Sequence, residues 1–391
     1  MKILCLGAAG KISRESAYDL VEYSDFEKIT IADYNEDAGM EVVKWLDDPR
    51  VDFVKIDVND FQSAVASIKG YDLAMDGTTI SLNDRSTACI AAAGVHGINL
   101  NGCGAEWDFD RQFSDNGKIC IPGVGMTPGT TNLMTRQAAD QLETVDTIRI
   151  SHGAFRPVAF SPAIAETTRV EYDPDLPSRV VYENGKFIQV PPFARPMEIE
   201  LPPPFGTHTQ YIIPHAETMT LPKSLADKQI QLIEVRGTWP PDNMALIRSL
   251  YDWGFMRNDK IEIDGIQIGI MDAIAGYLLQ SKEGQNTALY GYALHVEVTG
   301  IRKGKKYRHI LTHTHPASDG SVTGWEKLRA YTRCVGIPMS IGAQMIASGQ
   351  IHGSGVVAPE LALEPSAVFK ELARRGILIH EKIEEISSQE A

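Results

Sequence analysis

A glycine turn near the start of the chain has the residue types of a dinucleotide site. The run Gly7-Ala8-Ala9-Gly10-Lys11-Ile12-Ser13 follows the apolar segment Lys2–Leu6 and precedes a helical segment. Gly7 permits a tight turn, and Gly10 lets the backbone approach a pyrophosphate. The helix N-terminus would offer N–H groups and the positive end of its dipole to the phosphates. The spacing is Gly-x-x-Gly-x-x-Ser rather than the usual Gly-x-Gly-x-x-Gly, and a turn that binds nothing is the alternative.

An acidic residue at the end of the next apolar run argues that the glycine turn does bind a ligand. Ile29–Ala32 reads as a second strand and ends at Asp33, which is followed by Tyr34. A carboxylate at this place can accept both hydroxyls of an adenosine ribose, and its charge would repel a 2′-phosphate. The sequence therefore predicts that the cofactor is NAD rather than NADP.

Further cofactor contacts are expected at the carboxyl ends of later strands, where ligands bind in doubly wound sheets. Alternating strands and helices are predicted up to residue 125: strands at Val51–Val58, Tyr71–Met75, Ile98–Asn101 and Lys118–Ile121, helices at Phe61–Lys69 and Asn83–Ala93, the second closed by Gly94. The residues expected beside the cofactor are Asp57, Val58, Gly77, Thr78, Asn101 and Gly102. Asp57 could equally be a solvated strand end.

A turn rich in Gly and Pro, 122–132, comes next and opens a helix over Leu133–Gln141. It offers another helix N-terminus, and its Pro128 is expected to face the nicotinamide half of the cofactor or the substrate. A simple domain linker is the alternative.

A second group of residues could exchange a proton or bind a carboxylate. His215 and Glu217 are two residues apart on a segment that reads as extended, so they would point the same way, and histidine titrates near neutral pH. His152 follows the first strand of a second domain and could line its cleft. Arg236 or Arg156 could hold a carboxylate. For each residue the alternative is a structural histidine or a surface arginine.

From Thr144 onward the pattern of predicted secondary structure changes. Short segments rich in β-forming residues alternate with prolines, and 293–300 and 306–313 read as a hairpin across 301–305, which predicts a mostly antiparallel sheet. Helices are predicted at 244–253, 325–334, 341–348 and 365–376, and the polar end, Glu381–Ala391, is expected to fray. The C-terminal helices are expected to return to the first domain.

Composition and charge narrow the classes of protein. The chain has 391 residues, 43% of them hydrophobic and 23% charged, and a net charge of −14, which argues against nucleic acid and anionic membranes as partners. No apolar run reaches the ~20 residues of a membrane helix, and no signal peptide is recognisable. The five scattered cysteines indicate a reducing cytoplasm. His313 and His315 have metal-ligand types without a clearly spaced partner, so no metal is predicted.

Several stretches together resemble one family. They are the turn Gly7–Ser13 with Asp33, 93–96 (AGVH), 125–132 (GMTPGTTN), 184–186 (NGK), 220–222 (TLP), and the tail segments 336–338, 347–349 and 356–360. In this order they are similar to the saccharopine dehydrogenase-like group, which includes saccharopine reductase, lysine 6-dehydrogenase and carboxynorspermidine dehydrogenase. The family often has an Arg-aromatic-Pro-Gly-His run, but here it reads Thr238-Trp239-Pro240-Pro241-Asp242, where Arg236 could replace the lost arginine. The substrate therefore stays open.

The resemblance implies an α/β fold: a Rossmann-type parallel sheet (1–125), an inserted α+β catalytic domain (126–330), and C-terminal helices packing back on the Rossmann domain (331–391). It implies NAD(P)-linked oxidation of a carbon–nitrogen bond in an amino acid or amine, or the reverse imine reduction, with His215, Glu217, His152 and Arg236 as candidate catalytic residues. The alternatives are a dehydrogenase acting on a C–O bond or an opine-type amine, and a protein that binds NAD without catalysis. Exposed sheet surface in the second domain could support a homodimer.

Overall fold

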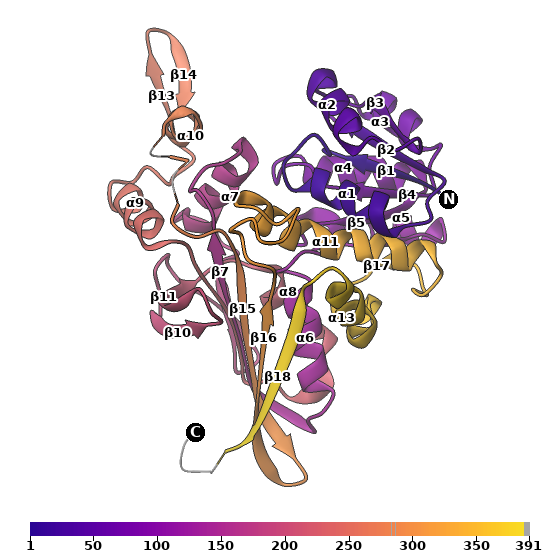
Figure 1. Cartoon of the computed structure of the whole chain (residues 1–391). Helices are drawn as coiled ribbons and strands as arrows, with labels where there is room; N and C mark the ends of the chain where they lie inside the picture. The colour runs from indigo at the N-terminus through magenta and orange to yellow at the C-terminus, as the bar shows by residue number, and fades with distance from the viewer. Residues whose placement is uncertain (283, 286, 387–391) are drawn as a thin grey trace. The chain divides into compact units, whose positions relative to one another are not determined.

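A computed structural model of the chain describes residues 1–282, 284, 285 and 287–386. The chain forms two compact units (Figure 1): the first contains Met1–Leu133 and Thr332–Arg375, and the second contains Met134–Tyr331 and the residues from Gly376 onward. Two helices, α6 (Thr130–Ala139) and α11 (Leu328–Ala347), continue from one unit into the other. Within the described ranges no helix is both long and apolar enough to cross a membrane.

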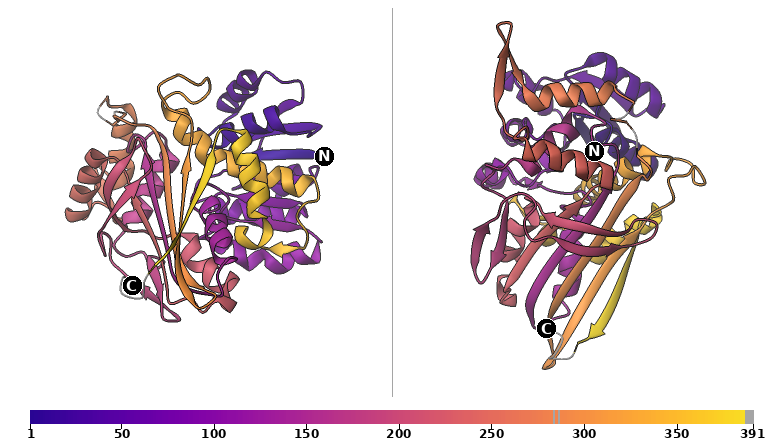
Figure 2. Two further views of the ribbon diagram at one scale, coloured as in Figure 1. Left: turned by 60° about the horizontal axis from the view of Figure 1, so that its bottom comes forward. Right: turned by 90° about the vertical axis from the view of Figure 1, so that its left-hand side faces the viewer.

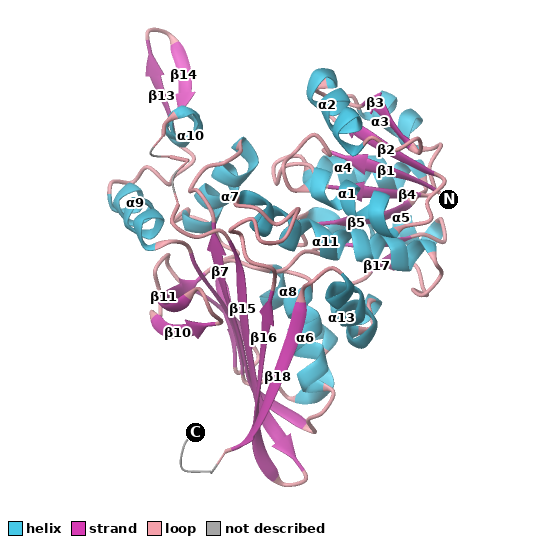
Figure 3. Cartoon of the chain, viewed as in Figure 1, coloured by secondary structure: helices cyan, strands magenta, loops and turns pink. Residues whose placement is uncertain are grey.

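The first unit is built on a seven-stranded sheet in the order β17-β6-β5-β4-β1-β2-β3, and every pair in it is parallel, as predicted. Its strands are β1 (Lys2–Leu6), β2 (Lys28–Asp33), β3 (Val51–Lys55), β4 (Leu73–Asp76), β5 (His96–Asn99), β6 (Ile119–Ile121) and β17 (Gly355–Val356). Its other helices are α1 (Ser13–Tyr23), α2 (Glu36–Leu46), α3 (Phe61–Ile68), α4 (Asn83–Ala93), η1 (Ala105–Phe109), α5 (Asp110–Asp115), α12 (Pro359–Ala362) and α13 (Pro365–Arg374). Figure 3 shows these helices around the sheet.

The strands of this sheet are short and lie in the interior of the first unit, because apolar side chains pack on both faces of the sheet. Four of the five residues of β1 are buried, with only Lys2 exposed. One face packs against α3, α4 and α5 through Ile68, Ile90 and Phe113. A fully buried side chain of this kind stabilises the fold by about 1.5–3 kcal/mol. The strand order reverses between β1 and β4, which places the ends of these two strands at the position where such sheets bind ligands.

The C-terminal segment 332–375 joins the first unit, which confirms that part of the chain returns to the parallel sheet. Gly336 of α11 lies so close to α1 that an added Cβ would be 2.8 Å from Ser16 Oγ. Arg375 donates from Nε to Asp19 Oδ1 at 2.7 Å, and both side chains are fully buried. Ser340 also donates to Asp19, at 2.7 Å. These polar contacts tie α1 to the C-terminal helices.

The second unit is built on a nine-stranded sheet whose main order is β10-β11-β12-β7-β15-β16-β18, with β8 paired to β12 and β9 paired to β8 (Figure 2). Its strands are β7 (Thr144–Phe155), β8 (Val180–Glu183), β9 (Lys186–Gln189), β10 (Met197–Leu201), β11 (Gly206–Ile212), β12 (Leu232–Thr238), β15 (Gly291–Arg302), β16 (Lys305–Thr314) and β18 (Leu378–Glu385). Only β7 and β12 pair in parallel, so the predicted mostly antiparallel sheet is confirmed.

The end of the chain differs from the prediction. Instead of fraying from residue 381, the chain forms β18, which pairs antiparallel with β16 over Leu378–Glu385. Arg308 lies opposite Glu384, and Lys305 binds Glu385 at 2.8 Å, so this polar strand is held by its pairing with β16 rather than by a core. Residues 387–391 lie outside the described residues. The predicted helices 325–334 and 341–348 are the single helix α11.

Four helices and a separate hairpin complete the second unit. The helices are α7 (Pro162–Tyr172), α8 (Ala216–Ser224), α9 (Pro241–Asp252) and α10 (Ile270–Gln280), with a short turn η2 (Ala226–Lys228). The hairpin is formed by β13 (Lys260–Ile263) and β14 (Ile266–Gly269) and makes its own two-stranded sheet.

The buried Asp19–Arg375 pair predicts a large loss of stability when one partner is removed. We expect Arg375→Met to lower the free energy of unfolding by about 3–5 kcal/mol, because Asp19 would keep a buried charge without its cation. Arg374→Met is the matched control, since Arg374 is 56% exposed. Urea unfolding measures both, and equal small losses would contradict the assignment.

Candidate active site

The predicted cofactor turn lies at the point where the parallel sheet reverses its order. Gly7 has a φ of 66°, and an added Cβ would lie 2.8 Å from the carbonyl oxygen of Gly77, which follows β4. Ser13 donates from Oγ to that same carbonyl at 3.2 Å. No side chain caps the start of α1. The turn therefore brings bare backbone and a helix N-terminus together, which fits a pyrophosphate.

Asp33 is held against this turn by backbone groups. Its Oδ2 accepts from the N–H of Ala9 at 3.3 Å, and its Oδ1 accepts from the N–H of Asn35 at 3.0 Å. The carboxylate is thus fixed beside the glycine turn at the end of β2, where a ribose acid is expected. Tyr34 next to it is 68% exposed and is available to an adenine ring.

The other predicted cofactor residues fall into two groups. Thr78 and Gly77 lie at the carboxyl end of β4, and the N–H of Thr78 donates to Asp76 at 2.9 Å. Asp57 lies past β3 and accepts from the N–H of Asn59 at 2.9 Å. These residues lie just past the carboxyl ends of β3 and β4, as predicted.

The remaining predicted cofactor residues are held in contacts within the protein. The side chain of Val58 is 5% exposed and belongs to the core, so only its backbone could meet a ligand. Asn101 and Gly102 both donate to Glu106 Oε1 at 2.9 Å. The carbonyl of Pro128 accepts from the N–H of Gly125 at 2.7 Å, which closes the Gly-Pro turn. Sequence reasoning did not single out Glu106, which organises this loop.

In the second unit, His152 lies near the carboxyl end of β7 and is 2% exposed. It pairs in register with Gly237 of β12 and with Leu294 of β15. An added Cβ on Gly237 would lie 2.7 Å from His152 Nε2, so the glycine leaves room for the imidazole. The hydroxyl of Tyr292 lies 3.3 Å from His152 Nδ1.

His215 and Glu217 do meet, but not on an extended segment. His215 is the extended residue just before α8, and Glu217 lies in the first turn of that helix. His215 Nδ1 and Glu217 Oε2 are 2.9 Å apart, and the two side chains are 12% and 0% exposed. The His215 ring lies 5.7 Å from that of His152. A carboxylate in the first turn is also favoured by the helix dipole.

Burial acts differently on the two histidines. Burial, reinforced by the charge of His215, lowers the pKa of His152 to about 3, so its ring stays neutral. Burial also disfavours a charged His215, but the charge and hydrogen bond of Glu217 outweigh it and raise the His215 pKa above histidine's ordinary 6.5. The two rings therefore differ in protonation: burial keeps His152 neutral, whereas Glu217 favours the protonated form of His215.

Arg156 directly follows β7 and is 2% exposed. Its guanidinium donates to the carbonyls of Pro157 and Val158 at 3.0 and 3.1 Å, and lies 5.6 Å from the ring of Tyr331. No carboxylate of the described residues lies within ion-pair distance, and Nε has no partner among them. The charge of Arg156 acts on the buried Glu171 without forming an ion pair, so its guanidinium can still bind the carboxylate of a ligand.

Arg236 is not brought together with these residues. It pairs in register with Ser151, one residue before His152, so it lies on the opposite face of the sheet. Its guanidinium binds Glu234 at 2.9 Å and also the carbonyl of Arg195. The prediction that Arg236 replaces a missing substrate cation is therefore corrected, because an internal ion pair occupies it.

Sequence reasoning missed two residues beside the histidines. Tyr292 stacks on His152, with ring centroids 5.6 Å apart, and alternation along β15 could have placed it on the buried face. Glu171 of α7 has a buried Oε2 without a hydrogen-bond partner among the described residues. Burial raises its pKa, while the charges of His215 and Arg156 act to lower it. No periodic signal marked Glu171.

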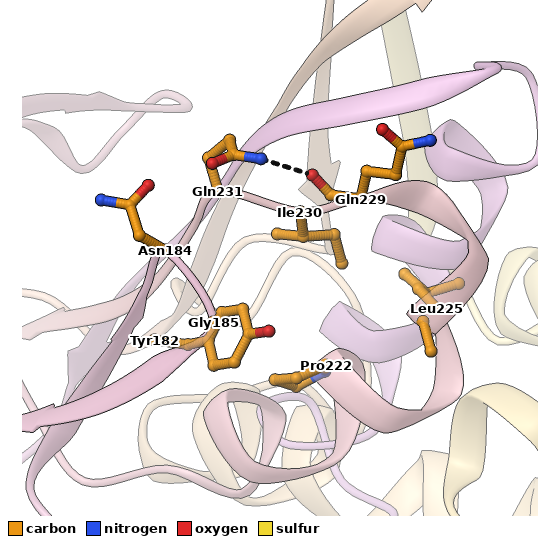
Figure 4. Close-up of a pocket in the computed structure, with 9 residues that line it drawn as sticks. Tyr182, Asn184, Gly185, Pro222, Leu225, Gln229, Ile230 and Gln231 are labelled. Atoms are coloured by element: carbon orange, nitrogen blue, oxygen red, sulfur yellow. Dashed lines mark hydrogen bonds between the residues drawn. The ribbon is translucent and has the colours of Figure 1, made fainter.

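A pocket of about 380 Å³ lies elsewhere in the second unit (Figure 4). It is bordered by Asn184, Gly185 and Pro222, with Gln231 donating to the carbonyl of Gln229 at 2.9 Å. Its lining contains no charged side chain and none of the predicted catalytic residues. The segments 184–186 and 220–222, which carried part of the resemblance, therefore contribute residues to the lining of this pocket.

The origin of the raised His215 pKa gives a direct prediction. In Glu217→Gln the carboxylate is lost while burial remains, so we expect the His215 pKa to fall below 6.5. An NMR titration of the imidazole signals measures it, with His215→Asn identifying the resonance. Glu381→Gln is the control, because Glu381 binds a different histidine, His309, at 2.8 Å. An unchanged His215 pKa in Glu217→Gln would contradict this account.

Comparisons with known proteins identify the family to which the chain belongs. Residues 3–121 match the saccharopine dehydrogenase NADP binding domain, and residues 125–377 match the saccharopine dehydrogenase C-terminal domain. The structure is similar to saccharopine dehydrogenase (L-Glu forming) from Saccharomyces cerevisiae, with a TM-score of 0.71, 14% identity, and 98% and 99% of the two chains covered.

Carboxynorspermidine synthase from Vibrio alginolyticus is 28% identical over 133 residues. That match covers 32% of this chain and only 30% of the relative. The two domain matches cover nearly the whole chain in the order that the fold requires. The chain therefore belongs to the saccharopine dehydrogenase family of NAD(P)-binding oxidoreductases.

Proposed function

We propose that this protein is an NAD-dependent oxidoreductase that acts on a C–N bond of an amino acid or amine. The observation that carries the proposal is the buried His215–Glu217 pair, with His152 beside it and Arg156 in the same unit. Oxidation of an amine needs a group that accepts a proton near neutral pH, and a His with a carboxylate partner supplies it. An amino-acid substrate also needs a cation for its carboxylate.

The residues of the second unit support a division of roles. When bound, the nicotinamide cofactor supplies the hydride acceptor for oxidation or the donor for imine reduction. His215 takes the proton of the substrate amine, and Glu217 holds and stabilises the resulting imidazolium. Arg156 binds the substrate carboxylate. His152, kept neutral by burial and contacted by Tyr292, orients the substrate by hydrogen bonding.

The charges of these groups already influence one another. Arg156 acts to lower the pKa of His152, and His215 acts to lower that of Glu171. The groups therefore share one electrostatic environment, in which water is scarce and charge interactions are strong. This environment suits a proton transfer coupled to the departure of a hydride.

The cellular compartment is part of the same proposal. Cys5, Cys120 and Cys334 are buried thiols whose pKa is raised by burial. Inert buried thiols are common in proteins of a reducing compartment, and this supports the cytoplasm.

A substrate screen with Arg156→Met tests the proposed reaction. We expect NADH formation with amino acids or amines, and for carboxylate-bearing substrates a KM about ten- to a hundredfold higher in Arg156→Met, because a buried charge-assisted bond is lost. Arg236→Met is the control, since Arg236 is also buried but its guanidinium is held by Glu234 at 2.9 Å. Turnover only on alcohols or hydroxy acids, or binding of NAD without turnover, would contradict the proposal.

The position of Asp33 tests the choice of cofactor. We expect the wild type to favour NAD, and Asp33→Ser to shift the ratio of kcat/KM for NAD and NADP toward NADP by about tenfold or more, because a like-charge repulsion is removed. Asp52→Ser on the neighbouring strand is the control; Asp52 binds Lys28 at 2.6 Å. A wild type that prefers NADP would overturn this assignment.

A further inference from the structure

The hairpin β13–β14 stands beside α10 as a separate sheet (Figure 1). Its strands are joined by Asp264 and Gly265, with φ values of 50° and 79°, as in the tight two-residue turns of hairpins. Within the described part of the chain no third strand pairs with it. A two-stranded sheet of this kind is only marginally stable in water.

One face of this hairpin is made of isoleucine. Ile261 pairs with Ile268, and Ile263 pairs with Ile266, so all four side chains point the same way. Ile261, Ile263 and Ile266 are 44%, 49% and 63% exposed. Natural edge strands are protected by short length, charged side chains, Pro, bulges or a covering element. β13 (KIEI) is short and charged, but it has no Pro and pairs with β14 without a register shift.

The turn determines which backbone groups of β13 face outward. In a hairpin with a two-residue turn, the residues next to the turn form a hydrogen-bonded pair, and hydrogen-bonded and non-hydrogen-bonded pairs then alternate. Ile263 and Ile261 therefore bond to β14. Lys260 and Glu262 direct their N–H and C=O groups to the free edge, and all four residues of the strand are exposed.

We propose that β13 pairs antiparallel with β13 of a second copy of this chain, with the two-fold axis at Ile261. In this register Lys260 is opposite Glu262 of the other copy, and the reverse pair forms by symmetry. The outward N–H and C=O groups of these residues are the ones that such a pairing bonds. The two hairpins then form one four-stranded sheet with a continuous isoleucine face.

Charge complementarity favours a second copy as the occupant of this edge. With a net charge of −14, the surfaces of two copies repel each other in general. β13 instead carries one cation and one anion, placed symmetrically about Ile261, so the strand is complementary to itself. Opposite charges directly across an antiparallel pair are stabilising, and like charges are destabilising. A register centred on Glu262 would place like charges together.

Charge variants of β13 test the proposal in the full-length chain. The pairing is short, so we expect a dimer with a dissociation constant in roughly the micromolar range, below the strength of standard interfaces. Glu262→Lys should raise that constant at least about tenfold in analytical ultracentrifugation, since two attractive pairs become repulsive. The double variant Lys260→Glu/Glu262→Lys should restore it, because the exchanged strand is again self-complementary.

Cross-linking gives a second, geometric test. In a background with the exposed Cys103 changed to Ser, oxidised Ile261→Cys should form a covalent dimer, because residues of a non-hydrogen-bonded pair lie within disulfide distance. Ile263→Cys should not, since two such residues would be about 13 Å apart along the strands. A monomer at all concentrations, a dimer unaffected by Glu262→Lys, or equal cross-linking at both positions would overturn the proposal.

Discussion

The buried ion pair between His215 and Glu217 is the interaction on which the proposed chemistry depends. Burial alone would keep both histidines of the site neutral, as it does for His152. Glu217, fully buried and 2.9 Å from His215, reverses that effect for one of them. Two histidines with ring centroids 5.7 Å apart thereby acquire opposite protonation behaviour. A single buried carboxylate thus makes the protonated form of one of two neighbouring histidines more favourable, which is the property that the proposed proton transfer requires.

Two features of the fold place these groups: the alternation of side chains along β7, and glycine residues that leave space beside the functional groups. Along β7 the side chains alternate between faces, so His152 lies with Tyr292 on one face while Ser151 lies with Arg236 on the other. Gly237 gives the imidazole the space that any side chain would fill. In the first unit Gly7 plays the same part, since its close approach to Gly77 exposes the backbone that a pyrophosphate would contact. At both positions, Gly7 and Gly237, a residue with a Cβ would not fit.

The sequence predicted local patterns well and long-range pairing poorly. The parallel strands, the helix Asn83–Ala93 with its left-handed cap at Gly94, and the hairpin of β15 and β16 follow from periodicity and turn chemistry, and the structure confirms them. β18 was missed because it is a polar segment that is held by antiparallel pairing with β16, a strand distant in the sequence. Arg236 was assigned to a substrate because strand register, which decides its face, is not visible in one sequence. Glu171 gave no signal because a lone acid in a helix resembles a solvated one.

The role of His215 is tested by the pH dependence of kcat/KM for NADH formation with an amine substrate, in the wild type and in His215→Asn. The wild-type value should rise with pH through an apparent pKa above 6.5, where the imidazole loses its proton and becomes a base. In His215→Asn this rise should disappear and the activity should stay low by about 10²–10⁴-fold. The same profile with the same rate in both proteins would show that His215 is not the proton acceptor.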